Sequence, residues 1–216
     1  MPRIPRARRR PAPPAATSRD RLLTAAAAEF AARGFAGTSV DRIARVARVN
    51  KAMIYYHFAS KAALYREILR DMFDAVARRV ADTGRSAADP ADKVRAFVEA
   101  IAIEAEARPH FPPIWFREIA EGGAHLDDQT VSHIAAVVTT LAAIIREGVA
   151  AKRFRSVNPL LLHAGIVGPL LLYFASGGIR KRLARSGVGG AAAIEQADVI
   201  AHIQRVALGT LEGQAS

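Results

Sequence analysis

The chain has 216 residues, of which 51% are hydrophobic, and this length is enough for one large domain or two modest ones. It contains no cysteine, which excludes disulfides, thiolate zinc sites and cysteine nucleophiles and makes a cytoplasmic location the expectation. The formal net charge of +11 resides in residues 1–66, with 14 basic and 3 acidic side chains, whereas residues 67–216 carry 17 of each sign. This asymmetry favours a polyanion-binding end joined to a neutral part with another task.

The first 16 residues contain five arginines and five prolines and lack the apolar segment of a secretory signal peptide. Proline at this density opposes helix and the charge opposes collapse, so we predict a disordered basic arm over residues 1–18. The longest apolar run, residues 159–175, is shorter than the roughly 20 residues that a membrane span needs. We therefore expect this run to be a buried helix pair and expect no membrane partner.

Helical periodicity of the apolar residues begins at Arg19 and predicts four helices, at residues 19–32, 39–47, 50–56 and 60–80. Gly34 is the expected stop of the first helix. The fourth helix is long and is expected to bridge to the second domain. The predicted N-caps are Ser18 for the first helix, Thr38 or Ser39 for the second, Asn50 for the third and Ser60 for the fourth.

Beyond residue 80 the pattern predicts further helices at 90–107, 113–121, 127–151, 157–175 and 191–212, separated by glycine and proline breaks. No strand pattern and no internal repeat is recognisable in the sequence. The fold is therefore predicted to be all-α.

The second and third predicted helices, with the short turn between them, have the compactness of a helix-turn-helix. Two helices that cross steeply need small or apolar residues at the crossing, and Ala44, Val49 and Ile54 fit those positions. Small Ala52 would let the third helix approach DNA closely, and Met53 suits contact with a thymine methyl group. The side chains left facing outward are those of Lys51, Ala52, Met53, Tyr55 and His57.

The run Ile54-Tyr55-Tyr56-His57-Phe58, followed by Ser60-Lys61 and by Leu64, resembles the DNA-binding domain of the TetR family of one-component repressors. The stretches 34–44 and 49–64 carry the likeness, which covers about residues 19–66. It implies an N-terminal three-helix helix-turn-helix (homeodomain-like) domain at 19–66 and a C-terminal helical domain at 67–216 for effector binding and dimerisation, with about nine helices in total. It also implies a cytoplasmic homodimer on a palindromic operator in double-stranded DNA, released by a small-molecule effector.

Carried over by position, the resemblance assigns DNA contacts to named residues. Phosphate contacts fall to Thr38, Ser39, Tyr55, His57 and Lys61, and positions near base edges fall to Lys51, Ala52 and Met53, flanked by Val40 and Asn50. Arg48 stands where most members have glycine, at a turn position that commonly has positive φ, and is expected to add a phosphate contact.

Two features of the DNA-binding part leave alternatives open. Tyr55, Tyr56 and His57 either contact DNA or pack in the core, because aromatic residues at helical spacing usually belong to a core. The arginine-rich arm is either a solvated tail or a segment that wraps DNA.

In the C-terminal part, two predicted helices carry apolar stripes suited to a two-fold four-helix dimer interface. The stripes are Val167, Leu170, Leu171 and Phe174 on one helix and Ile200, Ile203, Val206 and Ala207 on the other. The alternative is that these residues form internal core.

An effector pocket needs apolar walls and a few polar anchors, and the effector is expected to be small and apolar or amphipathic. Arg117 and Glu118 either anchor the effector or form an ion pair with each other that serves the structure alone. The aromatic candidates either line the pocket or belong to the core. His125 with Asp127 and Asp128 matches no established ligand spacing, so no metal site and no cofactor are predicted. The candidate pocket residues are Phe111, Trp115, Phe116, Arg117, Glu118, His125, His163, Tyr173 and Phe174.

Other functions find less support in the sequence. An enzyme is not expected, because no glycine-rich phosphate loop follows a strand and neither a Gly-x-Ser-x-Gly elbow nor a paired-histidine metal motif occurs. The neutral C-terminal part and the groove-reading motif argue against a sequence-neutral architectural DNA binder. An activator with the same fold remains an alternative to a repressor.

Overall fold

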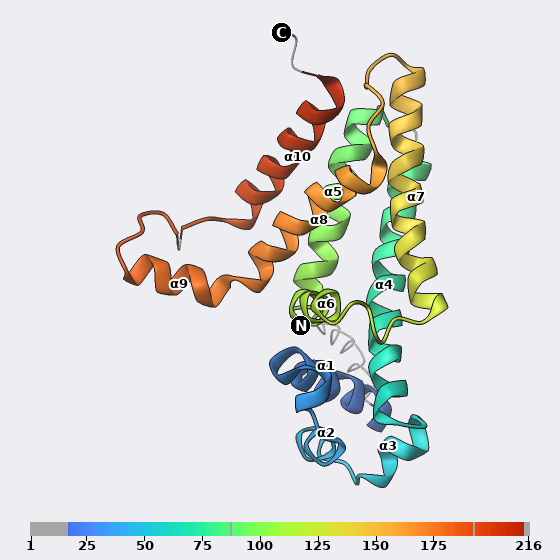
Figure 1. Cartoon of the computed structure of the whole chain (residues 1–216), viewed down its shortest axis with the longest axis vertical. Coiled ribbons are helices and arrows are strands. Elements are labelled where there is room, and N and C mark those ends of the chain that lie inside the picture. Colours follow the sequence, from blue (N-terminus) through green and yellow to red (C-terminus); the bar gives the residue numbers. More distant parts are fainter. Residues whose placement is uncertain (1–16, 87, 192, 214–216) are drawn as a thin grey trace, which may run out of the picture.

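The computed structural model describes residues 17–86, 88–191 and 193–213, and every regular element within these ranges is a helix. The predicted all-α fold is therefore confirmed. Of the disordered arm predicted over residues 1–18, residues 1–16 lie outside the described residues, whereas Thr17 and Ser18 cap and begin α1, so the prediction is wrong for these two. Ten helices follow one another (Figure 1): α1 Ser18–Gly37, α2 Val40–Ala47, α3 Ala52–His57, α4 Lys61–Arg85, α5 Pro90–Ala107, α6 Phe111–Ala120, α7 Asp128–Ala150, α8 Pro159–Ala175, α9 Gly177–Arg185 and α10 Gln196–Glu212.

α1 differs from the prediction in its N-cap and in the short segment after Gly34. Thr17, not Ser18, caps the helix: its hydroxyl accepts the N–H of Asp20 at 3.2 Å, and the Asp20 carboxylate accepts the N–H of Thr17 at 3.1 Å. Gly34 has non-helical backbone angles, with φ 73° and ψ 176°, and a short helical segment follows it to Gly37. Glycine therefore interrupts the helix where the sequence predicts its stop, because it adopts positive φ without steric cost.

Three further differences concern the C-terminal helices. α4 continues beyond the predicted end at Val80 to Arg85, and α10 begins at Gln196, later than predicted. The sequence prediction missed α9, which raises the number of helices among the described residues from nine to ten. α9 is short, begins with two glycines and bends 64° away from α8, and none of its residues is buried. Glycines at its start predict a loop and not a helix.

The N-terminal unit packs α1, α2 and α3 around the first turns of α4. The fully buried side chains of its core include Leu22, Phe30, Ile43, Ile54 and Leu64. Burial of each such side chain contributes about 1.5–3 kcal/mol to stability. This small core fixes the angle at which α3 leaves the body of the protein.

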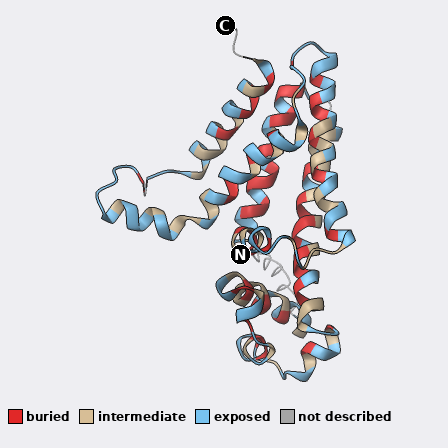
Figure 2. Cartoon of the chain, viewed as in Figure 1, coloured by how far each residue is buried: buried red, intermediate tan, exposed pale blue. Residues whose placement is uncertain are grey.

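The C-terminal unit is a layered helical bundle built on α4. This helix spans roughly 37 Å at 1.5 Å per residue and packs along α7 and α5, while α8 and α10 pack together against α5 (Figure 1). The buried residues of α4, α5 and α7 face one another across the bundle (Figure 2). α9 projects from the bundle between α8 and α10.

By length and composition alone, α7 would be able to cross a membrane, and so would the bent pair of α8 and α9 taken together. In the fold, α7 packs along α4 and α5 with Leu141, Ile144 and Ile145 buried. The apolar character of α7 is thus explained by its place in the bundle.

The two apolar stripes predicted to form the dimer interface lie mostly inside the chain. Leu170, Leu171, Ile203 and Ala207 are buried within one chain, where α8 meets its neighbours, so this part of the prediction is wrong. α8 is apolar on almost every side, and periodicity alone selected the wrong face. The large apolar side chains that α8 and α10 expose are Leu160, Leu161, Leu172 and Val206.

Candidate nucleic-acid interface and ligand cavity

The turn between α2 and α3 sets the direction of α3. Ser39 caps α2 by accepting a backbone N–H at 3.3 Å, and the helix ends at Arg48, with φ 54° and ψ 47°. This is the positive φ predicted at Arg48, and it costs a non-glycine residue about 1–2 kcal/mol. The N–H groups of Arg48 and Val49 donate to the carbonyls of Arg45 and Ala44 at 3.2 and 3.1 Å, which closes the turn.

α3 presents one side to solvent. At its start the Asn50 side chain accepts the N–H of Ala52 at 2.8 Å, and Ile54 is fully buried. Tyr55 and Tyr56 are 54% and 79% exposed, so the alternative that these two rings pack in the core is wrong. We call the exposed surface the α3 face and define it as Lys51, Ala52, Tyr55 and Tyr56.

An ion pair crosses the edge of the α3 face. Nζ of Lys51 lies 2.9 Å from Oδ1 of Asp41, in the first turn of α2. The hydrogen bond from Lys51 holds the pKa of Asp41 below its usual value, and the same bond raises the pKa of Lys51. Both groups are charged at neutral pH, so the predicted contact of Lys51 with a DNA base would compete with Asp41 for the ammonium group.

Thr38 has a structural role, and its predicted phosphate contact is wrong. It is 1% exposed, and its hydroxyl lies 2.8 Å from the carbonyl oxygen of Gly34 and 3.1 Å from that of Glu29. The side chain thus bonds carbonyls on either side of the turn that precedes the kink of α1 at Gly34. A buried hydroxyl in this position cannot reach a phosphate.

Lys61 performs a related task from the start of α4. Its ammonium group donates to the carbonyls of Phe35 and Thr38 at 2.9 and 3.0 Å and lies 4.2 Å from the centre of the Phe35 ring. Two of its three N–H donors are therefore engaged within the chain. A phosphate contact by Lys61 stays a prediction that depends on the third donor.

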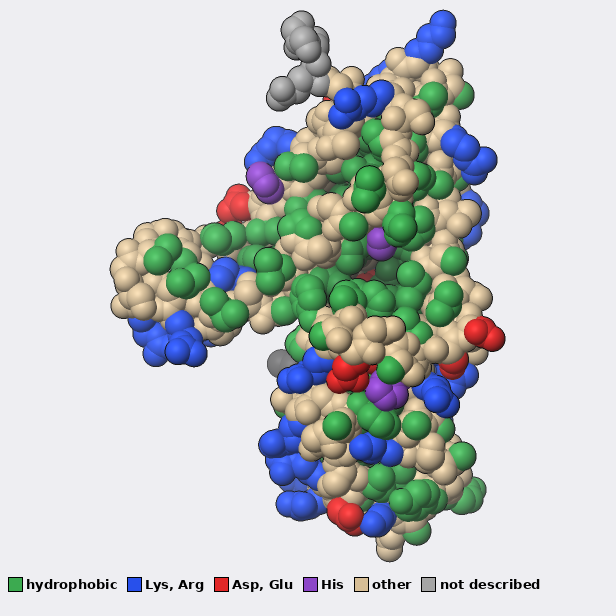
Figure 3. Space-filling model, in the orientation of Figure 1, with side chains coloured by type: hydrophobic (Ala, Val, Ile, Leu, Met, Phe, Trp, Pro, Cys, Tyr) green, Lys and Arg blue, Asp and Glu red, His purple; other side chains and the backbone are tan. Residues whose placement is uncertain are grey.

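The other predicted contacts lie around the α3 face. His57 is partly buried, with Nε2 3.1 Å from the hydroxyl of Ser18, and Val40 and Met53 pack partly against the core. Ser39 and Arg48 are exposed at the two ends of α2. Basic side chains gather over this end of the molecule and along α9 (Figure 3). The roles of these residues on DNA stay predictions.

The C-terminal unit encloses a small cavity of about 40 Å³ between α4, α5, α6, α7 and α8. Phe111, Trp115 and His163 line it, as expected for candidate pocket residues. Sequence reasoning missed most of the wall, because apolar residues at helical spacing are indistinguishable from ordinary core. The missed residues are Phe73, Val76, Ile101, Ile134, Val137, Val167 and Leu171.

The six other candidate pocket residues do not line this cavity. Phe116 packs against the core, and Tyr173 donates its hydroxyl to the carbonyl of Ile194 at 3.2 Å beside Phe174. Arg117 donates to the carbonyl of Ala32 in α1, at 3.3 Å. Arg117 and Glu118 form no ion pair with each other among the described residues, so the predicted mutual pair is wrong. A role of either residue in effector binding stays a prediction.

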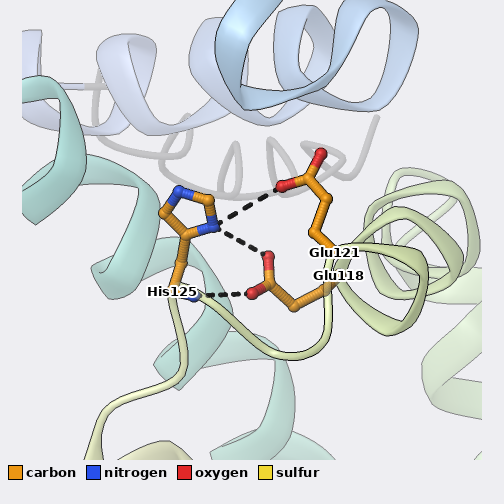
Figure 4. A group of neighbouring side chains, drawn as sticks. All are labelled: Glu118, Glu121 and His125. Atoms are coloured by element: carbon orange, nitrogen blue, oxygen red, sulfur yellow. Dashed lines mark hydrogen bonds and ion pairs between the residues drawn. The ribbon is translucent and has the colours of Figure 1, made fainter.

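Glu118 is fully buried at that boundary. Its carboxylate accepts the hydroxyl of Tyr65 at 3.1 Å and the backbone N–H of His125 at 2.7 Å, and it lies 3.2 Å from Nδ1 of His125 (Figure 4). Burial, followed by the negative charge of Glu118, raises the pKa of Tyr65 above its ordinary range. Asp127 is engaged elsewhere, capping α7, so it forms no ligand group with His125.

Two family models match the chain in tandem. Residues 22–68 match the model described as bacterial regulatory proteins, tetR family, and residues 90–203 match the model described as tetracyclin repressor-like, C-terminal domain. These ranges include α1 to α3 and most of the C-terminal bundle.

Curated relatives and solved structures agree with those matches. The chain is 30% identical over 159 residues to the HTH-type transcriptional repressor NicS of Pseudomonas putida, which covers 73% of this chain and 74% of NicS. It is 38% identical over 82 residues to the HTH-type transcriptional activator FasR of Mycolicibacterium smegmatis, covering 38% of this chain and 37% of FasR. The structure of the TetR family transcriptional regulator PfmR from Thermus thermophilus superposes with a TM-score of 0.67 at 23% identity, over 94% of this chain and 100% of PfmR.

We expect Thr38→Val to lower the free energy of unfolding by about 1–3 kcal/mol, because the buried carbonyl of Gly34 loses its donor. Chemical denaturation measures this loss, with Thr24→Val, an exposed helix position, as the matched control. The dependence of DNA affinity on salt should be unchanged, since no phosphate contact is removed. A shallower salt dependence would contradict the structural role.

We expect acid to destabilise the fold through His163. Burial lowers the pKa of His163 below 6.5, so the unfolded chain binds a proton there at higher pH than the folded chain does. The stability that neutral His163 contributes is complete above about pH 6.5 and declines as the pH falls below it. Thermal melting from pH 7 to 5 should therefore depend less on pH in His163→Leu, whereas the exposed-site control His202→Gln should match the wild type.

Proposed function

Since the chain belongs to the TetR family of bacterial regulatory proteins, we propose that it is a repressor that binds a palindromic operator as a homodimer and releases it on binding a small effector. Regulators of this family bind DNA and act as dimers, and this chain is a DNA-binding transcriptional regulator. The observation that carries the proposal is the α3 face, an exposed and partly basic surface held on the buried anchor Ile54.

We assign the reading of DNA to the α3 face and its flanks. Lys51 and Ala52, at the start of α3, lie where a recognition helix meets base edges in the major groove. The hydroxyls of Tyr55 and Tyr56 are exposed and suited to donate to phosphate oxygens. Ser39 and Arg48, at the two ends of α2, would hold the backbone on either side.

We place the dimer interface on the exposed side of α8, together with α10. Leu161, Gly165, Gly168 and Leu172 are exposed at helical spacing, and a β-carbon added at either glycine would meet open space. Hydrophobic side chains gather along the middle of this side of the molecule (Figure 3). Val206 of α10 extends the same surface, which suits the self-complementary contact of a two-fold dimer. Such a dimer would set the two α3 helices about 34–36 Å apart, one turn of DNA.

The small size of the cavity suggests how an effector would release the protein from its operator. Ligand pockets commonly measure about 300–1,000 Å³, whereas the cavity between α4 and α8 that Trp115 and His163 line measures about 40 Å³. An effector therefore has to displace the helices around it, including α4, whose Phe73 and Val76 form part of the wall. Because α4 starts inside the N-terminal unit, the displacement would alter the spacing of the α3 helices. Operator and effector then weaken each other's binding by the same factor.

We place the DNA-binding domain at 19–66 and the effector and dimer domain at 67–216, acting in the cytoplasm where bacterial DNA lies. The relatives are transcriptional regulators, which supports a protein without catalytic activity. The walls of the cavity are largely apolar, which favours an apolar or amphipathic effector.

An activator with the same architecture is the second candidate, because FasR is a transcriptional activator. Selection of bound fragments from random duplex DNA tests the shared part of both proposals. A site-specific regulator should select a palindromic sequence and bind it about 10³-fold or more tightly than it binds random duplex DNA. Transcription in vitro from a promoter carrying that palindrome then separates them, since a repressor lowers the transcript level and an activator raises it.

We expect two α3 variants to act differently on DNA binding. Tyr55→Phe removes a phosphate donor and should weaken binding to the selected and the random duplex alike, by about tenfold. Lys51→Ala should change the preferred sequence, because a base contact is worth about 1–3 kcal/mol of discrimination. Binding titrations at fixed salt measure both effects. If Tyr55→Phe changed the sequence preference, the division into phosphate and base contacts would be wrong.

A further inference from the structure

Three potential metal ligands meet where α6 ends against the N-terminal unit (Figure 4). Glu118 and Glu121 lie one helical turn apart at the end of α6, and His125 lies in the following loop. Their ligand atoms all lie within 4.8 Å of one another. Nδ1 of His125 is 3.2 Å from Oε2 of Glu118 and 3.7 Å from Oε2 of Glu121.

The loop returns His125 onto Glu118 through a defined backbone path. Gly122 and Gly123 have φ values of 71° and 77°, a conformation that favours glycine. The N–H of Gly123 donates to the carbonyl of Glu118 at 2.8 Å, and the N–H of His125 donates to the Glu118 carboxylate at 2.7 Å. Both hydrogen bonds hold the histidine ring over the two carboxylates.

One ring nitrogen and two carboxylates converge in this cluster. Nδ1 of His125 points toward the carboxylates of both Glu118 and Glu121, the arrangement of ligands around a shared ion (Figure 4). We propose that Glu118, Glu121 and His125 bind a divalent cation of the zinc class.

The two separations from the histidine nitrogen fit such an ion. Tetrahedral zinc with bonds of about 2.0–2.2 Å to nitrogen and oxygen places its ligand atoms about 3.3–3.6 Å apart, close to the 3.2 and 3.7 Å found between Nδ1 and the two carboxylates. One imidazole and two carboxylates are ligand types that Zn²⁺ accepts, with the fourth position left for water. The hydroxyl of Tyr65 bonds the Glu118 carboxylate at 3.1 Å, the kind of outer contact that orients a ligating carboxylate. The Glu121 side chain is 43% exposed and gives the ion an entry path.

The site would join the two units of the chain. The ring of His125 lies 4.2 Å from that of Phe35 in α1 and 5.1 Å from that of Tyr65 in α4, measured between ring centres. A bound cation fixes this ring and so braces the loop after α6 against the N-terminal unit. The site does not rest on the proposed repressor function.

Metal titration of the untagged full chain tests the proposal. We expect Co²⁺ to give visible absorption that saturates at one ion per chain and is displaced by Zn²⁺. Zn²⁺ at a hundredfold its Kd should raise the melting temperature by roughly 5–10 °C. His125→Ala should lose the absorption and the shift in melting temperature.

Two further variants keep the test independent of folding. Glu121→Gln retains an exposed side chain of the same shape and should weaken Co²⁺ binding at least tenfold. His133→Ala removes a histidine that lies 4.0 Å from one carboxylate, that of Asp74, and should bind Co²⁺ as the wild type does. Binding without saturation at one ion per chain, or equal affinity of Glu121→Gln and the wild type, would overturn the proposal.

Discussion

Both units of this protein depend on the continuity of one helix, α4. Near its start the ring of Tyr65 packs against Phe30 of α1, with ring centres 4.7 Å apart. Two turns later Phe73 packs edge-on against Trp115 of α6 at 4.8 Å, in the wall of the cavity. These two contacts are separated by eight residues, about 12 Å along the axis. Because protein interiors are close-packed, a displacement of one end of such a helix is felt at the other.

The boundary between the units is polar, unlike the cores on either side. Arg117 reaches a carbonyl of α1, and the buried carboxylate of Glu118 is bonded to Tyr65 and His125. A buried charge is costly unless all its hydrogen-bonding positions are used, so this boundary tolerates only a few arrangements. A polar junction of this kind favours defined relative positions of the two units, which suits a regulator that has to switch between states.

The helix-turn-helix was predictable because its signals are local. Caps such as Ser39 and Ser60, the positive φ of Arg48 and the buried position of Ile54 all depend on residues a few places away in the chain. The same reasoning was wrong about Thr38, whose hydroxyl is used by carbonyls of α1. The sequence motif does not show whether such a hydroxyl already donates a hydrogen bond to a carbonyl of a neighbouring helix.

Composition, periodicity and a short motif established the all-helical class, the basic N-terminal helix-turn-helix and the family. These properties follow from interactions within about one or two helical turns, which the order of residues specifies directly. Packing of distant segments decided which side of α8 faces solvent, which residues enclose the cavity and where Glu118 and His125 meet. An apolar side chain has the same sequence pattern in a core, a cavity wall or an interface, so only the three-dimensional arrangement of the helices separates these roles.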